Sequence, residues 1–166
     1  MASRTGRTEA LMTAGLNLIQ QALSIYDSDL RLAACNRRFQ EMFDLPDRLV
    51  TPGAGFEDTI RFLVERGEYG TVEDADEAVR GRVEVARQFQ PHYMERTRPD
   101  GRTISVEGTP LPEGGWVTVY TDITPTRQHE AMLRARSEEL SGQLVTHAEE
   151  LSAANRQLAA TNAALE

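Results

Sequence analysis

The sequence predicts an α+β fold: a five-stranded antiparallel sheet with helices on one face, an N-terminal amphipathic helix and a long C-terminal helix. Three observations predict it. Segments of strand character occur at residues 23–27, 30–35, 92–98, 102–110 and 115–123. Helical patterns fill the stretch between the second and third of these segments. From residue 126 onward the chain is rich in Ala, Glu, Gln, Arg and Leu, a composition typical of one continuous helix.

The N-terminal helix is predicted within residues 1–22. From Thr8 onward, apolar residues between Leu11 and Ala22 fall at the spacing of one helix face. The apolar stripe is wide, so we expect it to be buried against the sheet, against a second chain, or against both.

Three helices are expected between the two groups of strands. Asn36 caps the first, because its side chain can accept hydrogen bonds from the free N–H groups of the first turn. The second spans Phe56–Glu65. Thr71 is the expected cap of the third, and Pro91 ends it, since proline cannot continue a helix.

The last three strands form a meander. Pro99, Asp100 and Gly101 join its first two strands and are a hairpin signal, because glycine takes the positive φ that such turns require. Neither face of the last strand is fully polar, so we expect both faces of the sheet to be covered.

The C-terminal segment has the spacing of a parallel dimeric coiled coil. Leucines recur every seven residues in two frames that differ by four residues, a stutter that locally unwinds a supercoil. Asparagines on the adjacent seam fix the register of such coils. The predicted dimer residues are Leu133, Leu140, Leu144, Leu151, Asn155, Leu158 and Leu165.

Composition excludes several classes of function. The net charge of −8 and the pI near 5.0 argue against nucleic acid and against an anionic membrane surface as partners. No apolar run approaches the ~20 residues that span a bilayer, and no secretory signal is visible. Cys35 is the single cysteine, which fits a reducing compartment. We therefore expect a cytoplasmic protein.

No catalytic constellation emerges from the motifs, so we expect no enzymatic activity in this chain. The three histidines lie far apart without metal-ligand spacing, and no metal site is expected. Cys35 precedes Asn36 at the end of a strand, which does not match the Asn-Cys-Arg-Phe stretch of flavin photoreceptors. Haem is possible through His92, but we expect neither haem nor flavin to be bound tightly.

Several stretches together resemble a PAS domain, in particular the subtype placed ahead of bacterial sensor histidine kinases. The resemblance covers about Leu16 to Arg127. The stretches that carry it are Asn36–Phe39, Glu65–Gly70, Arg98–Arg102, Pro112–Gly115 and Asp122–Thr124.

The resemblance implies an N-terminal cap or dimer-contact helix at residues 1–22, a sensor domain at 23–125 and a coiled-coil linker at 126–166. Asp122, Ile123 and Thr124 would join the sheet to the output helix and transfer the signal. A small ligand could occupy the space between sheet and helices; the alternative is that the same residues simply fill the core. The pocket candidates are Phe39, Met42, Phe43, Ile60, Leu63, Val79, Val83 and His92.

The function implied is that of a sensory input module in bacterial two-component signal transduction. It would act as a parallel homodimer and pass a ligand- or partner-induced change to a kinase dimerisation domain in a longer chain. Two alternatives stay open: a constitutive dimerisation scaffold without ligand, and a haem- or flavin-bearing redox or gas sensor. An absorption spectrum of the purified protein separates these two.

Overall fold

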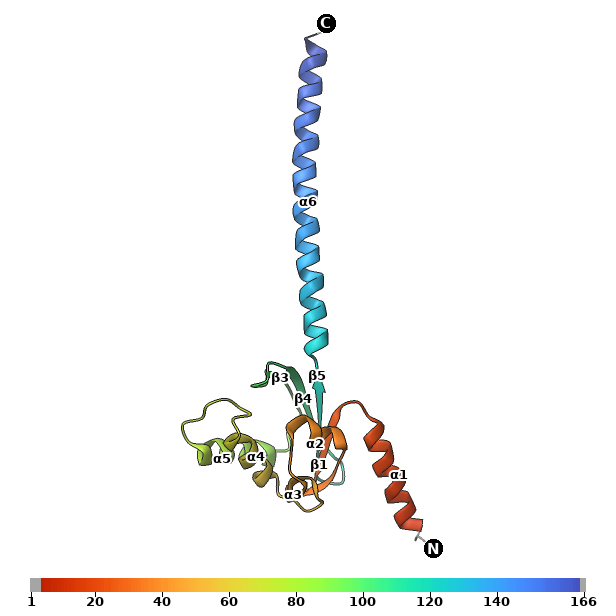
Figure 1. Ribbon diagram of the computed structural model, residues 1–166, viewed down its shortest axis with the longest axis vertical. Coiled ribbons are helices and arrows are strands. Elements are labelled where there is room, and N and C mark those ends of the chain that lie inside the picture. Colours follow the sequence, from red (N-terminus) through yellow and green to blue (C-terminus); the bar gives the residue numbers. More distant parts are fainter. Residues whose placement is uncertain (1–3, 165–166) are drawn as a thin grey trace. The chain divides into compact units, whose positions relative to one another are not determined.

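The computed structural model describes residues 4–164 and confirms the predicted antiparallel sheet, whose strand order is β2-β1-β5-β4-β3 (Figure 1). The first and last strands in sequence, β1 and β5, therefore lie side by side in its middle, paired from Ala22 with Tyr120 to Tyr26 with Trp116. The strands are β1 (Ala22–Tyr26), β2 (Leu32–Cys35), β3 (His92–Thr97), β4 (Thr103–Pro110) and β5 (Trp116–Asp122).

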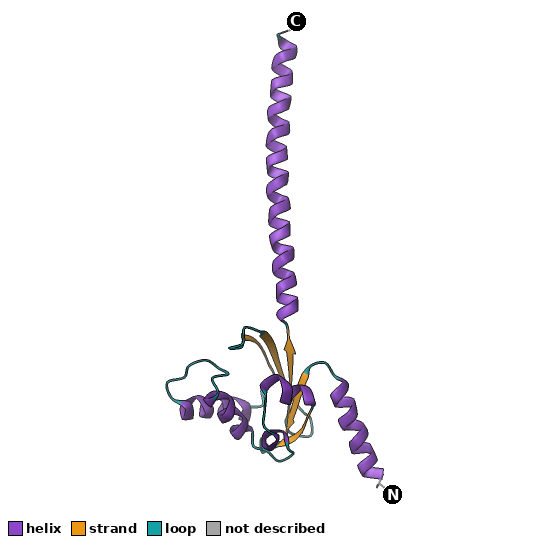
Figure 2. Ribbon diagram, viewed as in Figure 1, coloured by secondary structure: helices purple, strands orange, loops and turns teal. Residues whose placement is uncertain are grey.

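Four helices between β2 and β3 pack on one face of this sheet, as predicted (Figure 2). The short α3 was not predicted. Two further helices, α1 and α6, flank the sheet in sequence. The helices are α1 (Arg4–Leu18), α2 (Arg37–Phe43), α3 (Asp47–Val50), α4 (Phe56–Glu65), α5 (Ala75–Arg87) and α6 (Thr124–Ala163).

The core lies between these helices and the sheet, in two clusters. Phe39 and Phe43 of α2 are both almost fully buried in the first cluster and contact the ring of Tyr120 at centroid distances of 5.6 and 5.0 Å. The second cluster joins α4 to α5 and includes Val79 and Val83. The two clusters explain why the apolar sides of α4 and α5 follow helical spacing in the sequence.

The two faces of the sheet differ in how well they are covered. Trp116 and Thr118 are buried beneath the helices, whereas Val117 and Val119, on the opposite face, remain half-buried. The expectation that both faces are covered is therefore wrong for the single chain as described. Gly108 belongs to the covered face, where a Cβ atom would collide with the Trp116 ring.

Asn36 connects three elements through four hydrogen bonds and confirms the predicted cap. Its Oδ1 accepts from the backbone N–H groups of Phe39 at 3.1 Å and Leu23 at 3.0 Å. Its Nδ2 donates to the carbonyl oxygens of Gln21 at 2.8 Å and Leu16 at 3.1 Å. One buried amide thus uses its full hydrogen-bonding capacity to fix the end of α1, the start of β1 and the start of α2.

The N-terminal helix differs from its prediction. It ends at Leu18, and residues 20–21 form a bend that leads into β1. Its large apolar side chains are not buried against the sheet: Leu11, Met12 and Leu18 are 66%, 65% and 82% exposed. Of the two surfaces considered for this stripe, the sheet is excluded in the described chain.

The start of α5 also corrects a prediction. Asp74, not Thr71, caps this helix, and its carboxylate accepts from the N–H groups of Asp76 at 2.9 Å and Glu77 at 3.1 Å. A carboxylate satisfies two free donors and carries the charge that the helix dipole favours, so it outcompetes a threonine three residues earlier.

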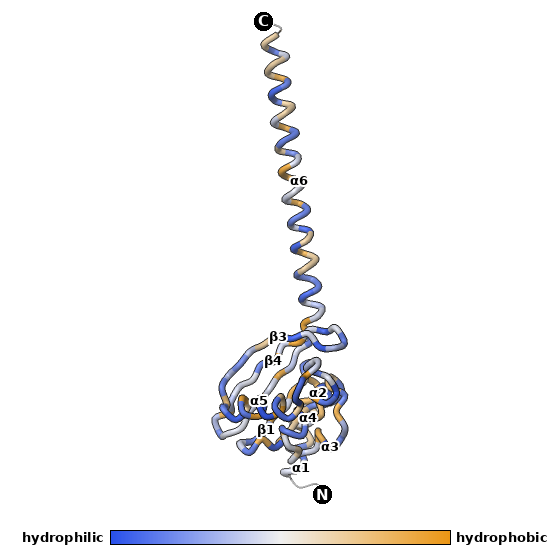
Figure 3. The backbone as a smooth tube through the Cα atoms, turned by 90° about the vertical axis from the view of Figure 1, so that its left-hand side faces the viewer, coloured by the Kyte–Doolittle hydropathy of each residue, from blue (hydrophilic) through white to orange (hydrophobic). Residues whose placement is uncertain are grey.

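The described residues form two compact units, residues 4–124 and residues 125–164. Hydrophobic and hydrophilic residues alternate along α6 (Figure 3), and none of its described side chains is buried. In the part of the chain that the structure describes, no helix is both long enough and apolar enough to cross a membrane. The predicted division at residues 22 and 125 stays a prediction.

Candidate functional site

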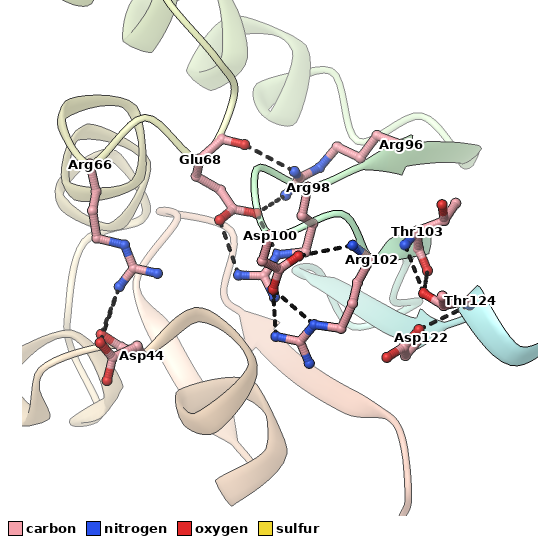
Figure 4. A network of polar contacts seen from close by, with 10 residues as sticks. All are labelled: Asp44, Arg66, Glu68, Arg96, Arg98, Asp100, Arg102, Thr103, Asp122 and Thr124. Atoms are coloured by element: carbon pink, nitrogen blue, oxygen red, sulfur yellow. Dashed lines mark hydrogen bonds and ion pairs between the residues drawn. The ribbon is translucent and has the colours of Figure 1, made fainter.

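The joint between β5 and α6 is held by hydrogen bonds to the first residue of β4, Thr103 (Figure 4). The Thr103 N–H donates to Thr124 Oγ1 at 2.8 Å, and the Ile123 N–H donates to the Thr103 carbonyl at 2.9 Å. The Thr124 N–H in turn donates to Asp122 Oδ1 at 3.0 Å. Hydrogen bonding from Thr124 holds the pKa of Asp122 below its ordinary value. The three predicted joint residues therefore attach the start of α6 to the first residue of β4 through Ile123 and Thr124, with Asp122 holding the Thr124 N–H.

The turn of the β3–β4 hairpin directly precedes Thr103 and contains three charged residues that contact one another, Arg98, Asp100 and Arg102. Gly101 takes a φ of 87°, as the turn requires, and its N–H donates to the Arg98 carbonyl at 2.9 Å. The Asp100 carboxylate accepts from Arg102 Nε at 2.8 Å and from the Arg102 N–H at 3.0 Å. Asp100 also contacts Arg98 Nη1 at 3.4 Å. The predicted hairpin is confirmed.

A buried ion pair ties this hairpin to the connector between α4 and α5, residues 66–74. Glu68 and Arg98 are 3% and 5% exposed at their side chains, with Arg98 Nε and Nη2 donating to the two Glu68 oxygens at 2.8 and 3.1 Å. Arg96 Nη2 adds a third contact to Glu68 at 2.9 Å. Burial alone would raise the pKa of Glu68, but the two arginines outweigh it and hold this pKa below its ordinary value.

The ion pair also contacts the core. The Arg98 guanidinium carbon lies 5.1 Å from the centroid of the Phe43 ring, in the first core cluster. On the other side of the connector, Arg66 donates to the Asp44 carbonyl at 3.1 Å, so the connector is attached to the end of α2 as well (Figure 4). Polar contacts thus lead from α2 and the connector through the hairpin to the start of α6.

An open groove of about 840 Å³ lies between the connector, α5 and the β3 end of the hairpin. Tyr69 forms part of its lining, with the guanidinium carbons of Arg82 and Arg96 at 3.9 and 4.8 Å from the ring centroid. Apolar contributions come from Val64 and Val72. None of the eight predicted pocket residues lines this groove.

Those pocket candidates lie elsewhere in the first unit. Phe39, Phe43, Leu63, Ile60, Val79 and Val83 are buried in the two core clusters, and Met42 packs half-buried against the first. His92 is exposed on β3, where its ring stacks on Trp116 at 5.2 Å. The structure therefore brings seven of the eight into the core, separates His92 from them, and leaves their role as ligand contacts a prediction.

The coiled-coil candidates that the structure describes are all on α6. Leu133, Leu140, Leu144, Leu151 and Leu158 are between 44% and 71% exposed, and Asn155 is exposed too. Leu165 lies outside the described residues. Among residues 4–164, no three His, Cys, Asp or Glu side chains are placed to hold a metal ion.

Sequence reasoning did not connect Glu68, Arg82, Arg96 and Arg98. The signal available was the run of charged residues in Glu65–Gly70 and in Arg96–Arg102. Their pairing depends on β3 folding back beside the connector, a contact across about thirty residues that local patterns do not encode.

Comparison with known proteins agrees with this architecture. The chain is 26% identical over 140 residues to the non-motile and phage-resistance protein of Caulobacter vibrioides, and 25% identical over 136 residues to the sensor protein DivL of the same organism. These alignments cover 83% and 77% of the chain. The chain spans only 15% and 16% of the length of these two relatives.

Among solved structures, the PAS domain of Bordetella pertussis BvgS superposes with a TM-score of 0.53 at 18% identity, over 80% of this chain and 98% of that one. This likeness shows the fold. The family model described as the PAS fold matches residues 16–131, which include the sheet, the connector, the hairpin and the joint. The chain belongs to the PAS fold family.

Proposed function

We propose that this chain is a sensory PAS input module that dimerises and transmits a conformational change through α6 to a histidine kinase output. The change is set by a ligand or a partner bound to the first unit. The output domains belong to a longer protein, as the length of the curated relatives suggests, and one of those relatives is named a sensor protein.

The joint carries this proposal. Asp122, Ile123 and Thr124 make hydrogen bonds that fasten the first turn of a forty-residue helix to Thr103. Any displacement of the β3–β4 hairpin relative to the rest of the sheet acts on Thr103, and therefore on the residues from which α6 begins. A PAS domain is a regulatory module, and in this proposal the joint is the place where a conformational change passes from the sheet to α6.

Dimerisation is supported by what α6 leaves unburied. Its leucines are more than 40% exposed at heptad spacing, and a helix of this length gains its stability from packing one face against a partner. A second copy of the same helix supplies an identical apolar seam, with Asn155 fixing a parallel register. The occupant we propose is therefore a second copy.

A further contact between the copies is proposed at the N-terminal helix. Leu11, Met12 and Leu18 are exposed on α1, and Val117 and Val119 are half-buried on the uncovered face of the sheet. Covering both apolar surfaces in a homodimer removes them from water. The cytoplasmic location and the kinase dimerisation domain as the downstream partner are parts of the same proposal.

Light scattering of residues 1–166 across a dilution series tests the proposal. We expect a dimer at micromolar concentration. A monomer under those conditions contradicts the transmission scheme, because a single α6 has no partner against which its register can change.

A further inference from the structure

The groove beside the connector has a charge that differs from the rest of the chain. Its lining contains three arginines and two glutamates, which leaves one positive charge, whereas the whole chain carries −8. A small anion approaching this acidic protein therefore meets a locally favourable surface here. The volume of about 840 Å³ falls within the usual range of small-molecule sites.

Arg82 is the group whose surroundings point to a ligand. Glu68 accepts hydrogen bonds from both Arg96 and Arg98, but Arg82 contacts no carboxylate within the described chain. Its Nη1 donates to the Ala78 carbonyl at 3.0 Å, and its guanidinium carbon lies over the Tyr69 ring, 3.9 Å from the centroid. A guanidinium has five N–H donors, and the contacts of Arg82 with the Ala78 carbonyl and the Tyr69 side chain leave others that can donate to an anion.

Arg96 also contacts the Tyr69 ring. It lies 4.8 Å from the Tyr69 ring centroid and also lines the groove, so two guanidinium groups from different elements, α5 and β3, are fixed by one ring. Half-buried Val72 and Ala75 supply apolar surface in the same groove. Fixed positive groups beside an apolar wall suit a carboxylate that carries an apolar body, because both parts of the molecule find a partner.

We propose that this groove binds a small carboxylate with an apolar body, held by Arg82 and Arg96. The inference rests on the proposed sensory function and names the class of its ligand. Arg96 also donates to Glu68, so a carboxylate that engages Arg96 changes the ion pair between Glu68 and Arg98. That pair leads through the hairpin to Thr103 and the joint, which gives the groove a route to α6.

The test uses the complete chain of residues 1–166 with benzoate and cyclohexanecarboxylate as probes, and benzamide as the uncharged counterpart of benzoate. Backbone amide NMR shifts and their saturation give the site and Kd. We expect both carboxylates to bind saturably with shifts centred on Tyr69 and Gly70, and benzamide to bind far more weakly. Arg82→Gln should raise Kd about tenfold or more, the effect of losing one charged hydrogen bond.

Arg87→Gln is the matched control, since it removes the same charge from an exposed position of α5 outside the groove. Its Kd should stay within about twofold of the wild-type value, because surface charges of this kind contribute little. The inference is overturned if neither carboxylate binds saturably, if Arg82→Gln leaves Kd unchanged, or if the two variants weaken binding equally.

Light scattering on the same samples separates the two proposals. A dimer that does not bind either carboxylate removes the ligand class and leaves the transmission scheme standing. A monomer that binds benzoate through Arg82 keeps the groove and removes the transmission scheme.

Discussion

Residues 4–124 and residues 125–164 differ in whether their hydrophobic side chains are buried within the chain. The first unit buries sixteen hydrophobic side chains between the sheet and its helices, whereas α6 buries none. Apolar residues recur at helical spacing in α4 and α5 as well as in α6, so the sequence pattern alone does not tell the two units apart. The difference is one of available neighbours: α4 and α5 have each other and the sheet, while α6 has no such surface in its own unit. The first unit is thus stabilised within the chain, whereas we propose that α6 is stabilised by a second copy.

The largest effect is expected when charged residues replace leucines of the proposed α6 seam. Leu144→Glu combined with Leu151→Glu should convert the dimer to a monomer, because burying each leucine contributes about 1.5–3 kcal/mol and a dimer contains four of them. We expect a rise in the dimer Kd of more than about 10⁴-fold by light scattering and analytical ultracentrifugation. Loss of helical circular dichroism from α6 should accompany it, while the first unit keeps its unfolding transition.

Thr146→Glu combined with Ala153→Glu is the matched control for the seam. These exposed positions lie on the face of α6 opposite Leu144 and Leu151, and the substitutions add the same two charges. The control should remain dimeric. If it dissociates as readily as the seam variant, repulsion between charges and not an apolar seam governs association.

The second largest effect concerns the ion pair buried in the first unit. Glu68→Ala leaves Arg98 buried without its carboxylate, and breaking such pairs costs about 3–5 kcal/mol. Urea unfolding of the first unit should show this loss, with the α6 dimer unaffected. Glu57→Ala, which removes an exposed partner of Arg61, should cost less than about 1 kcal/mol. Equal losses in the two variants would mean that Glu68 contributes no more than a surface group.

The same carboxylate predicts how the first unit responds to acid. Because Arg98 and Arg96 hold the folded-state pKa of Glu68 below its ordinary value of 4.5, the unfolded state binds the proton more readily. The stabilisation is complete above about pH 4.5 and is lost as pH falls through the lower, folded-state pKa. Urea midpoints should drop more steeply below about pH 4.5 in the wild type than in Glu68→Gln. Parallel curves would contradict this assignment.

The sequence predicts local features of this fold better than contacts between distant segments. Asn36, the Pro99–Gly101 turn and the five strands follow from neighbouring residues, and all are confirmed. The position of α1 does not follow, because an amphipathic stripe specifies burial without naming the partner. The groove is the extreme case: Arg82, Arg96 and Tyr69 come from three elements, and only the folded sheet brings them together.

The joint offers the smallest but most specific test, because it lies where the self-contained unit ends and the dependent helix begins. Asp122→Ala removes the acceptor for the Thr124 N–H at the start of α6, and the loss of such a hydrogen bond costs about 0.5–1.5 kcal/mol. Hydrogen exchange at the Thr124 amide should accelerate correspondingly, while amides in the centre of the sheet keep their protection. Asp122→Asn should keep most of the protection of the Thr124 amide, since an asparagine oxygen can accept the same hydrogen bond. If Asp122→Ala instead accelerates exchange throughout the sheet, the joint is part of the core of the first unit and not a separable outlet to α6.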